Sequence, residues 1–357
     1  MTRETDGGAP LTLAQGAHIT ASAPVRVDMG GTLDMPAFYF PLTHLRPLTV
    51  NLAVSLRTQV ELTAWKSGEN RIVSRGFAPV TWPAGTLRND HPLGFIAAIL
   101  AAFQASGLQV TIDSAAPPRS GMGGSSTVAV ALVAALYHLS GRQEMDDTLR
   151  RDIAAAAHGI ESSVLGIPCG MQDHLAAAFG GMHAWYWQGI RPGGGYRRKP
   201  LIPAAEADRW SSRLRVAYLG EPHDSAAVNS VWVTQFLGGR FCAEWEAIIR
   251  CTHAFCAAVE RGDVPRAAAA MNQETDIRCS LTPDVLTPLG RLLTDAGRKH
   301  GCGVRFTGAG AGGCLWALGA EGDICKMSSE WADIMNSSAD AGQIDCHVDL
   351  SGVTVAA

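Results

Sequence analysis

The sequence Pro117-Pro118-Arg119-Ser120-Gly121-Met122-Gly123-Gly124-Ser125-Ser126-Thr127 combines a glycine- and serine-rich loop with the start of an apolar segment. Glycines allow the loop Ser120–Ser126 to turn back on itself and bring backbone N–H groups close to an anion. We expect a helix over Thr127–Leu139. Its first N–H groups and the positive end of its dipole would face the loop. The stretch therefore predicts an anion site; the alternative is an ordinary helix capped by Ser125 or Ser126.

Two other nucleotide-binding patterns are excluded. No G-x-x-x-x-G-K-[ST] occurs in the chain, which excludes Lys-dependent Walker A chemistry. The segment Thr307–Cys314 contains G-x-G-x-x-G, but the residues after it have the pattern of a strand rather than a helix. A Rossmann NAD site is therefore not expected. We expect a glycine turn between the strands Gly303–Thr307 and Cys314–Leu318, where backbone can approach a ligand.

Two carboxylates, Glu161 and Asp173, flank the segment Gly166-Ile167-Pro168-Cys169-Gly170. A turn there can fold both into one site, where one carboxylate would hold a cation and the other would take a proton. The alternative is a capping Glu and an unrelated loop Asp. His174, directly after Asp173, is expected to be structural.

Composition limits the class of protein. The chain has 357 residues, 47% of them hydrophobic and 17% charged, with net charge -4. This length suggests two subdomains that share an interface. No basic stripe is present, so we expect no nucleic-acid partner. The longest apolar stretches, Leu93–Phe103 and Val128–Leu139, are too short to span a bilayer, so no membrane partner is expected.

The compartment follows from the cysteines and the first residues. The nine cysteines have irregular spacing without a Cys-x-x-Cys pair, and Met1–Pro10 contains no apolar segment. We therefore expect a cytoplasmic protein with reduced thiols and no structural zinc.

Hydrophobic periodicity predicts an α+β fold, because strands cluster early and helices mix with strands later. Residues 1–17 are expected to be a loose leader. Arg191–Pro200 is the best candidate for a hairpin or linker. The other expected strands are His18–Met29, Leu48–Thr63, Gln109–Ile112 and Leu214–Leu219; the other expected helices are Pro92–Ala105, Asp147–Gly159, Ala226–Phe236, Glu244–Val259, Val264–Asn272 and Val285–Lys299.

Together these segments resemble the GHMP kinase superfamily, in which three motifs occur in this order. Ala23-Pro24-Val25-Arg26-Val27-Asp28-Met29-Gly30-Gly31-Thr32-Leu33-Asp34-Met35-Pro36 resembles the first motif, closest to heptose-phosphate kinases and fucokinases. The Pro117–Thr127 loop resembles the phosphate loop, and Gly303–Cys314 resembles the third motif. Glu161 with Leu165–Gly170 and Asp173 resembles galactokinases, whereas Gln172-Asp173 and Ala176–Gly181 resemble heptose-phosphate kinases.

The resemblance implies a two-domain GHMP kinase fold and an activity. Residues 1–200 would form an N-terminal domain like ribosomal protein S5 domain 2, with the ATP and phosphate loop, and residues 201–357 a ferredoxin-like C-terminal domain. The active site would lie between them. The implied reaction is ATP-dependent phosphorylation of a hydroxyl, anomeric in many relatives, of a sugar or sugar phosphate such as a heptose phosphate or a fucose-like sugar. The protein would be a monomer or a homodimer.

The resemblance also implies roles for particular residues. Asp173 would be the general base, and Arg26 would lie near the transferred phosphoryl group. Mg²⁺ would be held by Ser125 and Glu161. ATP would contact the loop residues Pro118, Ser120, Gly121, Met122, Gly123, Gly124, Ser125 and Ser126. The substrate would contact Asp34, Gly31, Thr32, Gly308, Gly310 and Gly312.

Departures from the family pattern leave alternatives open. Gly124 replaces a usual Ser or Thr, and Arg305 is close to where many relatives have Lys. The first motif lacks the Glu-His of galactokinases, which argues against galactose as the substrate. A non-sugar kinase of the mevalonate or homoserine type is one alternative. The other is a sugar-binding homologue without turnover.

Overall fold

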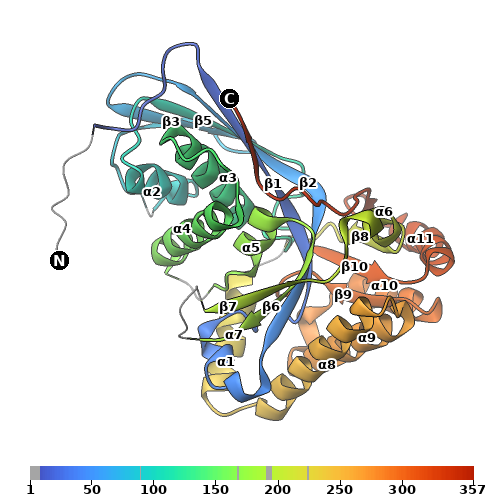
Figure 1. The fold of residues 1–357 in the computed structure, drawn as a ribbon. Coiled ribbons are helices and arrows are strands. Elements are labelled where there is room, and N and C mark those ends of the chain that lie inside the picture. Colours follow the sequence, from blue (N-terminus) through green and yellow to red (C-terminus); the bar gives the residue numbers. More distant parts are fainter. Residues whose placement is uncertain (1–8, 89, 167–168, 190–194, 223–224) are drawn as a thin grey trace.

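The computed structural model describes residues 9–88, 90–166, 169–189, 195–222 and 225–357. Helices and strands are arranged around two sheets, which lie at opposite ends of the molecule in Figure 1. This architecture confirms the predicted α+β class. Positions 1–8 of the expected leader, 191–194 of the expected hairpin and 167–168 of the carboxylate segment fall outside the described residues.

The first sheet contains eight strands among the described residues, with the order β12-β1-β2-β5-β3-β4, while β6 pairs with β2 and β7. The pair β3–β5 is parallel and the others are antiparallel. The strands are β1 (His18–Met29), β2 (Leu48–Ala64), β3 (Glu69–Ser74), β4 (Val80–Pro83), β5 (Leu108–Ser114), β6 (Met182–Trp187), β7 (Tyr196–Pro200) and β12 (Thr354–Ala356).

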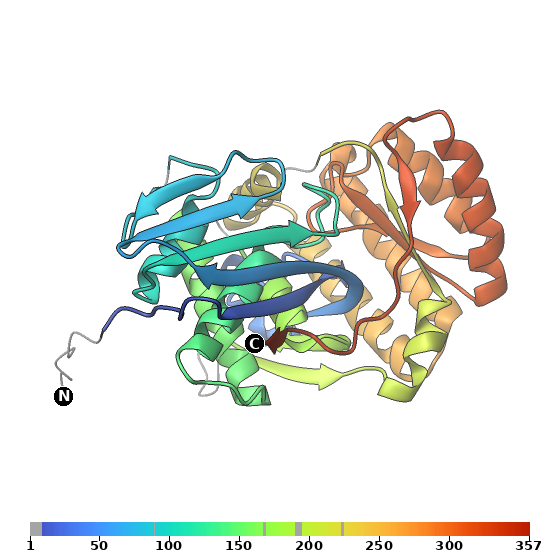
Figure 2. The same cartoon turned by 90° about the horizontal axis from the view of Figure 1, so that it is seen from above.

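One face of this sheet is covered by helices, as Figure 2 shows. The helices are α2 (Gly94–Ala102), α3 (Gly124–Leu139), α4 (Asp147–Leu165) and α5 (Gln172–Phe179). Helix α3 is buried along most of its length, which explains why it is apolar on nearly every side. Helix α4 begins where the Asp146 side chain accepts a hydrogen bond from Leu149 N, and ends at Gly166 with φ +61°.

The long hairpin of β1 and β2 extends from the first sheet toward the second. Its register shifts between Pro24 and Val25, where a bulge interrupts the pairing. Bulges bend and twist strands and change the direction of the side chains that follow. Arg26 and Asp28 lie just beyond this bulge, in the part of β1 that packs near the second sheet.

The second sheet is antiparallel, with the order β11-β8-β10-β9. Its strands are β8 (Leu214–Tyr218), β9 (Gly303–Phe306), β10 (Cys314–Leu318) and β11 (Gly342–Ile344). Val216 and Trp316 pack in one apolar cluster with α8 and α9, whereas Ala217 and Leu315 pack in another with α10 and α11. The helices are α7 (Ser225–Leu237), α8 (Cys242–Glu260), α9 (Val264–Leu281), α10 (Pro288–Lys299) and α11 (Glu321–Met335).

Short helices complete the chain: α1 (Pro36–Tyr39), α6 (Ala207–Ser211) and the 3₁₀ turns Thr43–Leu45, Ala204–Glu206 and Pro283–Val285. After β11 the chain returns to the first sheet, where β12 pairs with β1. On the way, Arg57 forms an ion pair with Asp349 and donates to the carbonyl of Gly352. The C-terminal segment therefore ties the two sheets together. No helix of the described residues is long and apolar enough to cross a membrane.

Several expected boundaries are confirmed and others are wrong. Strand β1 has the predicted bounds, and β10 does too. Helix α3 begins three residues before the expected Thr127, because Gly124 to Ser126 already have helical backbone. Helix α9 continues beyond the expected end at Asn272 to Leu281. The sequence did not predict β3, β4, β6, β11, β12, α1, α5, α6 or α11.

Candidate functional site

A cavity of about 700 Å³ lies between the β3–β4 region, helix α2 and the start of α3. Apolar side chains line part of it, among them Phe77, Phe95 and Ile96. Another part is polar and contains Arg26 and Asp173. Predicted nucleotide-loop residues in its wall are Pro118, Ser120, Gly121, Gly123, Gly124 and Ser125. Such a combination suits a ligand with a flat apolar portion and an anionic portion.

The polar part of the cavity is the N-terminus of helix α3. Gly123 precedes the helix with φ +79°, a conformation that favours glycine. Its carbonyl accepts the first helical bond, from Thr127 N at 2.9 Å. The N–H groups of Gly124, Ser125 and Ser126 precede that bond and have no partner within the helix. The expected anion site therefore consists of the first helical turn as well as the loop, and neither serine caps the helix.

Both serines instead donate to Glu161. Ser125 Oγ lies 2.6 Å from Oε1 and Ser126 Oγ 2.9 Å from Oε2. His174 Nε2 lies 2.7 Å from the same Oε2. Burial alone would raise the pKa of Glu161, but hydrogen bonds from His174 and the two serines hold it below its usual value. Glu161 is therefore an anion at neutral pH. The sequence did not predict the contact between His174 and Glu161.

This oxygen set fits a hard divalent cation. Ser125 and Glu161 would supply a hydroxyl and a carboxylate to Mg²⁺, which prefers oxygen ligands and usually keeps phosphate or water in its shell. The described residues contain no group of three or more His, Cys, Asp or Glu that could hold a metal on its own. Ser125 and Glu161 would leave the remaining positions around such a cation to phosphate or water oxygens.

Arg26 and Asp173 form an ion pair next to the loop. Arg26 Nε lies 2.7 Å from Asp173 Oδ1, and its NH1 donates to the carbonyl of Gly121 at 2.6 Å. Burial alone would lower the pKa of Arg26, but the charges of Asp173 and Asp28 raise it above its usual value. Among the described residues none donates a hydrogen bond to Asp173 Oδ2, so this oxygen is available to a ligand.

Asp34 lies next to this pair. Its side chain is buried, and its Oδ2 accepts a hydrogen bond from Gln172 N at 3.0 Å. Burial, followed by the charge of Asp173, raises the pKa of Asp34 to about 6. The structure thus brings Asp34 and Asp173, which are far apart in the sequence, to adjacent positions at the start of helix α5.

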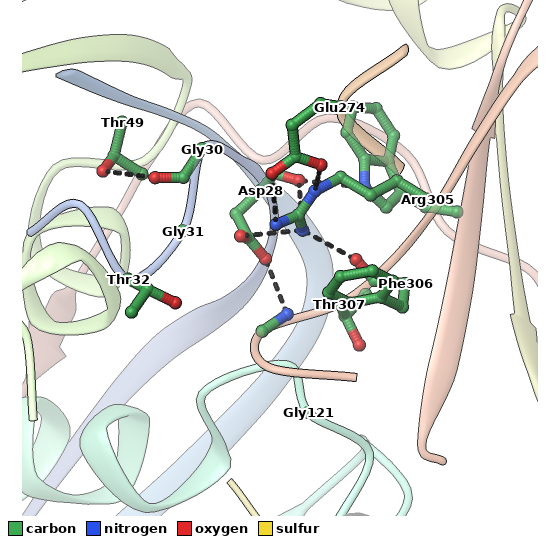
Figure 3. A network of polar contacts seen from close by, with 12 residues as sticks. Asp28, Gly30, Gly31, Thr32, Thr49, Gly121, Glu274, Arg305, Phe306 and Thr307 are labelled. Atoms are coloured by element: carbon green, nitrogen blue, oxygen red, sulfur yellow. Dashed lines mark hydrogen bonds and ion pairs between the residues drawn. The ribbon is translucent and has the colours of Figure 1, made fainter. Parts of the chain in front are cut away.

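A buried network at the end of β1 joins the two sheets (Figure 3). Asp28 Oδ2 lies 3.0 Å from Arg305 NH1, and its Oδ1 accepts from Gly308 N at 2.8 Å. Arg305 also binds Glu274, with Nε 2.8 Å from Oε2. Sequence reasoning did not predict roles for Asp28 and Glu274. Their signal was weak, because a single Asp in a strand and a single Glu in a helix are common.

The loop Gly31-Thr32 is held by Arg278 of helix α9. Arg278 NH2 donates to the carbonyl of Gly31 at 2.5 Å, and its NH1 lies 3.4 Å from Thr32 Oγ1. The guanidinium carbon of Arg278 lies 4.7 Å from the ring centroids of both Trp232 and Trp245. Thr32 has φ +76°, a conformation that β-branched residues rarely adopt. Arg278 therefore holds this loop in a strained conformation.

Some predicted site residues lie away from the cavity. Met122 is fully buried and its carbonyl accepts a hydrogen bond from Arg26 N, and Ser126 faces Glu161. Gly310 packs against Val285, and Gly312 against the carbonyls of Glu221 and Pro222. Of the third-motif glycines that were expected at the substrate, only Gly308 lies beside Arg26.

Comparison with known proteins finds a family model that covers this site. A model of the GHMP kinases N terminal domain matches residues 90–181, a range that includes the loop, Glu161 and Asp173. The mevalonate kinase of Pyrococcus horikoshii is 26% identical over 212 residues, and the alignment covers 59% of this chain and 59% of that protein. The chain thus matches about three fifths of the length of this relative.

Solved structures share the fold over nearly the whole chain. D-glycero-D-manno-heptose 1-phosphate kinase from Bacteroides thetaiotaomicron superposes with a TM-score of 0.72 at 17% identity, covering 95% of this chain and 99% of that one. Galactokinase from Lactococcus lactis, solved with galactose, superposes with a TM-score of 0.73 at 14% identity, covering 95% of each chain. These matches confirm the predicted fold.

Proposed function

We propose that the chain is an ATP-dependent kinase, because a model of the GHMP kinases N terminal domain matches residues 90–181 and solved sugar kinases share the fold. Its acceptor would be a hydroxyl of a sugar or sugar phosphate, such as a heptose phosphate or a fucose-like sugar. The observation that carries the proposal is the position of Arg26, which contacts both Asp173 and the carbonyl of Gly121 in the phosphate loop. A single guanidinium therefore lies between the candidate nucleotide site and the candidate acceptor site.

The donor half of the reaction would use the first turn of α3. The free N–H groups of Gly124 to Ser126 would bind the phosphates of ATP, and the apolar walls at Phe95 and Ile96 would contact the base. Mg²⁺ held by Ser125 and Glu161 would neutralise phosphate charge. Arg26 would offset the charge that develops on the transferred phosphoryl group.

The acceptor half would use the two carboxylates. Asp173 Oδ2 would accept the proton of the attacking hydroxyl, whose oxygen then bonds to the γ-phosphorus as the bond to ADP breaks. Asp34 would accept hydrogen bonds from neighbouring hydroxyls of the substrate. A polyol supplies such donors on adjacent carbons, which supports a sugar acceptor. The anomeric hydroxyl is the proposed site of phosphorylation.

One observation supports a second candidate. The detected sequence relatives include a mevalonate kinase, so a non-sugar acceptor is the competing proposal. The two candidates differ in their need for Asp34. A mevalonate-type acid offers no vicinal hydroxyl pair to this carboxylate, so it would not depend on Asp34 for hydrogen bonding in the same way.

ADP release with coupled detection tests the proposal. The wild-type protein should release ADP with at least one member of a panel of hexoses, heptoses and their phosphates, above its rate with ATP alone. Asp173→Asn provides the matched control, because it keeps the shape of the side chain and removes the proton acceptor. Turnover only with mevalonate or homoserine would favour the second candidate. Nucleotide binding without any turnover would support a binding protein instead.

A further inference from the structure

Six charged side chains form a continuous chain from the candidate base to the loop Gly31-Thr32. In order they are Asp173, Arg26, Asp28, Arg305, Glu274 and Arg278, here called the buried ion chain. The successive N–O distances are 2.7, 3.4, 3.0, 2.8 and 2.9 Å. Negative and positive groups alternate, so the buried ion chain carries no net charge. Five of its members are 0–3% exposed, and Asp173 lines the cavity.

Asp28 lies inside the buried ion chain and has an additional partner, the Gly308 N–H. Its Oδ1 lies 3.4 Å from Arg26 NH1 and accepts the hydrogen bond from Gly308 N at 2.8 Å. Its Oδ2 binds Arg305, a residue of β9 in the second sheet. Figure 3 shows the carboxylate between the Arg305 guanidinium and the loop that follows Phe306. One carboxylate therefore contacts groups from both sheets at once.

Two of the glycine-rich segments contact Asp28 directly, and the phosphate loop contacts its neighbours Gly308 and Arg26. A Cβ at Gly31 would overlap the Asp28 carboxylate, so the first segment needs glycine there. A Cβ at Gly308 would lie 2.8 Å from the carbonyl of Gly121, so the third segment packs directly on the phosphate loop. That same carbonyl accepts the hydrogen bond from Arg26 NH1 at 2.6 Å. Arg26 therefore contacts Asp28 on one side and the phosphate loop on the other, and Gly308 contacts both of these partners.

Resting on the proposed function, we propose that Asp28 is a positioning residue for phosphoryl transfer: it fixes the guanidinium of Arg26 relative to the Gly308 loop and the second sheet. Asp28 does not line the cavity and acts through Arg26. Buried ion pairs are weak evidence for stability in themselves, because desolvation offsets much of the attraction. The geometry gives Asp28 a positioning role instead, because its two oxygens contact both arginines and the Gly308 N–H.

Asp28→Asn separates charge from shape. Asn keeps the size of the side chain and can still accept from Gly308 N, but it removes the charge that faces Arg26 and Arg305. The Arg26 guanidinium would then be held by Asp173 and the Gly121 carbonyl alone. We expect kcat to fall by about tenfold to a hundredfold, the scale of a small misplacement in a reacting site. Affinity for ADP, which lacks the transferred phosphate, should stay within about twofold because the base pocket is untouched.

A double variant separates positioning from folding stability. Asp28→Asn with Arg305→Met removes one negative and one positive charge, and leaves the pairs Arg26–Asp173 and Glu274–Arg278 balanced. We expect the melting temperature to recover toward that of the wild type, while kcat stays low. Asp349→Asn is the matched control, because it breaks another partly buried ion pair between the C-terminal segment and the first sheet. It should lower the melting temperature and leave kcat unchanged.

A binding measurement makes the test independent of the acceptor. Calorimetry would compare ADP with an ATP analogue that has a non-hydrolysable β–γ linkage. Wild type should bind the analogue more tightly than ADP, and Asp28→Asn should lose that difference. The proposal is overturned if the variant keeps it, or if kcat in the double variant recovers together with the melting temperature. Wild type that binds both nucleotides but turns over no acceptor contradicts the proposed function, while the nucleotide comparison still decides the role of Asp28.

Discussion

The carboxylate of Asp34 occupies the space that a side chain at Gly170 would need. A Cβ at Gly170 would overlap the Asp34 oxygens, although the backbone there is not in the left-handed region. Close approach, rather than an unusual φ, therefore requires glycine at this position. At this contact the segment before helix α5 packs against the loop that carries Asp34. Asp34 therefore lies beside Asp173.

Gly170→Ala should displace Asp34 without altering any charge. We expect the KM for the sugar to rise about tenfold or more, since a charged hydrogen bond contributes about 1.5–3 kcal/mol. The KM for ATP should change little. Steady-state kinetics with each substrate varied in turn measures this. Gly322→Ala in helix α11 is the control, because its Cβ meets nothing within 4 Å, and it should leave both KM values unchanged. Equal effects of the two variants on the KM for the sugar would contradict the steric role of Gly170.

Asp173→Asn tests the proton acceptor. The change keeps the contact with Arg26 possible and removes the basic oxygen, so kcat should fall by about a hundredfold or more. ADP affinity should stay close to that of the wild type, which calorimetry would show. A variant with near-normal turnover would exclude Asp173 as the base.

The raised pKa of Asp34 predicts a pH dependence of stability. Its carboxyl binds a proton more tightly in the folded state, with a pKa of about 6 against 3.8 for the ordinary group. The contribution of Asp34 to stability should therefore fall by about 3 kcal/mol as pH rises from about 4 to 6, and stay constant above that. Asp34→Asn should be more stable than wild type at pH 7.5, with the gap closing near pH 4. Melting curves across this range measure it; a gap independent of pH contradicts the assignment.

Substrate use should show the opposite trend with pH. Ionised Asp34 accepts two hydrogen bonds from hydroxyls, and its protonated form accepts fewer, so kcat/KM for the sugar should decline as pH falls through about 6. Asp34→Ala should weaken sugar use by about tenfold or more and spare nucleotide binding. A variant with a lower melting temperature and an unchanged sugar KM would show that Asp34 only stabilises its loop.

The metal requirement should depend more on Ser125 than on Ser126. Ser125 faces the cavity and Ser126 is buried against Glu161, so Ser125→Ala should raise the Mg²⁺ concentration for half-maximal activity more strongly. Titration of Mg²⁺ at saturating ATP measures this. The oxygen ligands also predict activity without any other metal. Stoichiometric zinc whose removal abolishes activity would contradict this assignment.

The parts of the site that sequence could predict depend on local pattern. Strand β1 alternates and ends at a glycine pair, and Glu161 and Asp173 flank a segment of turn-forming residues. The sequence predicts that helix α3 starts at Thr127, because Gly124, Ser125 and Ser126 have the composition of a loop. They are helical because the first turn of a helix tolerates them when its N–H groups face a cavity.

The parts that sequence could not predict depend on tertiary contacts. Glu274 and Arg278 are polar residues on a buried helix face. They interrupt the apolar period of α9, so the sequence pattern does not predict its last two turns. Their partners lie on other elements, Arg305 on β9 and Gly31 after β1. Strand β6 was missed although Met182–Trp187 is a continuous buried run, a pattern that short apolar helices share.

Phosphorus NMR of the reaction products tests the central claim most directly. Wild-type protein would be incubated with ATP, Mg²⁺ and the sugar or sugar phosphate that supports the fastest ADP release. The account predicts a new phosphate monoester whose phosphorus couples to the anomeric proton, formed in equal amount to ADP and lost with Asp173→Asn. A new resonance only in samples that contain mevalonate or homoserine, or ADP release without any phosphorylated sugar, would contradict it.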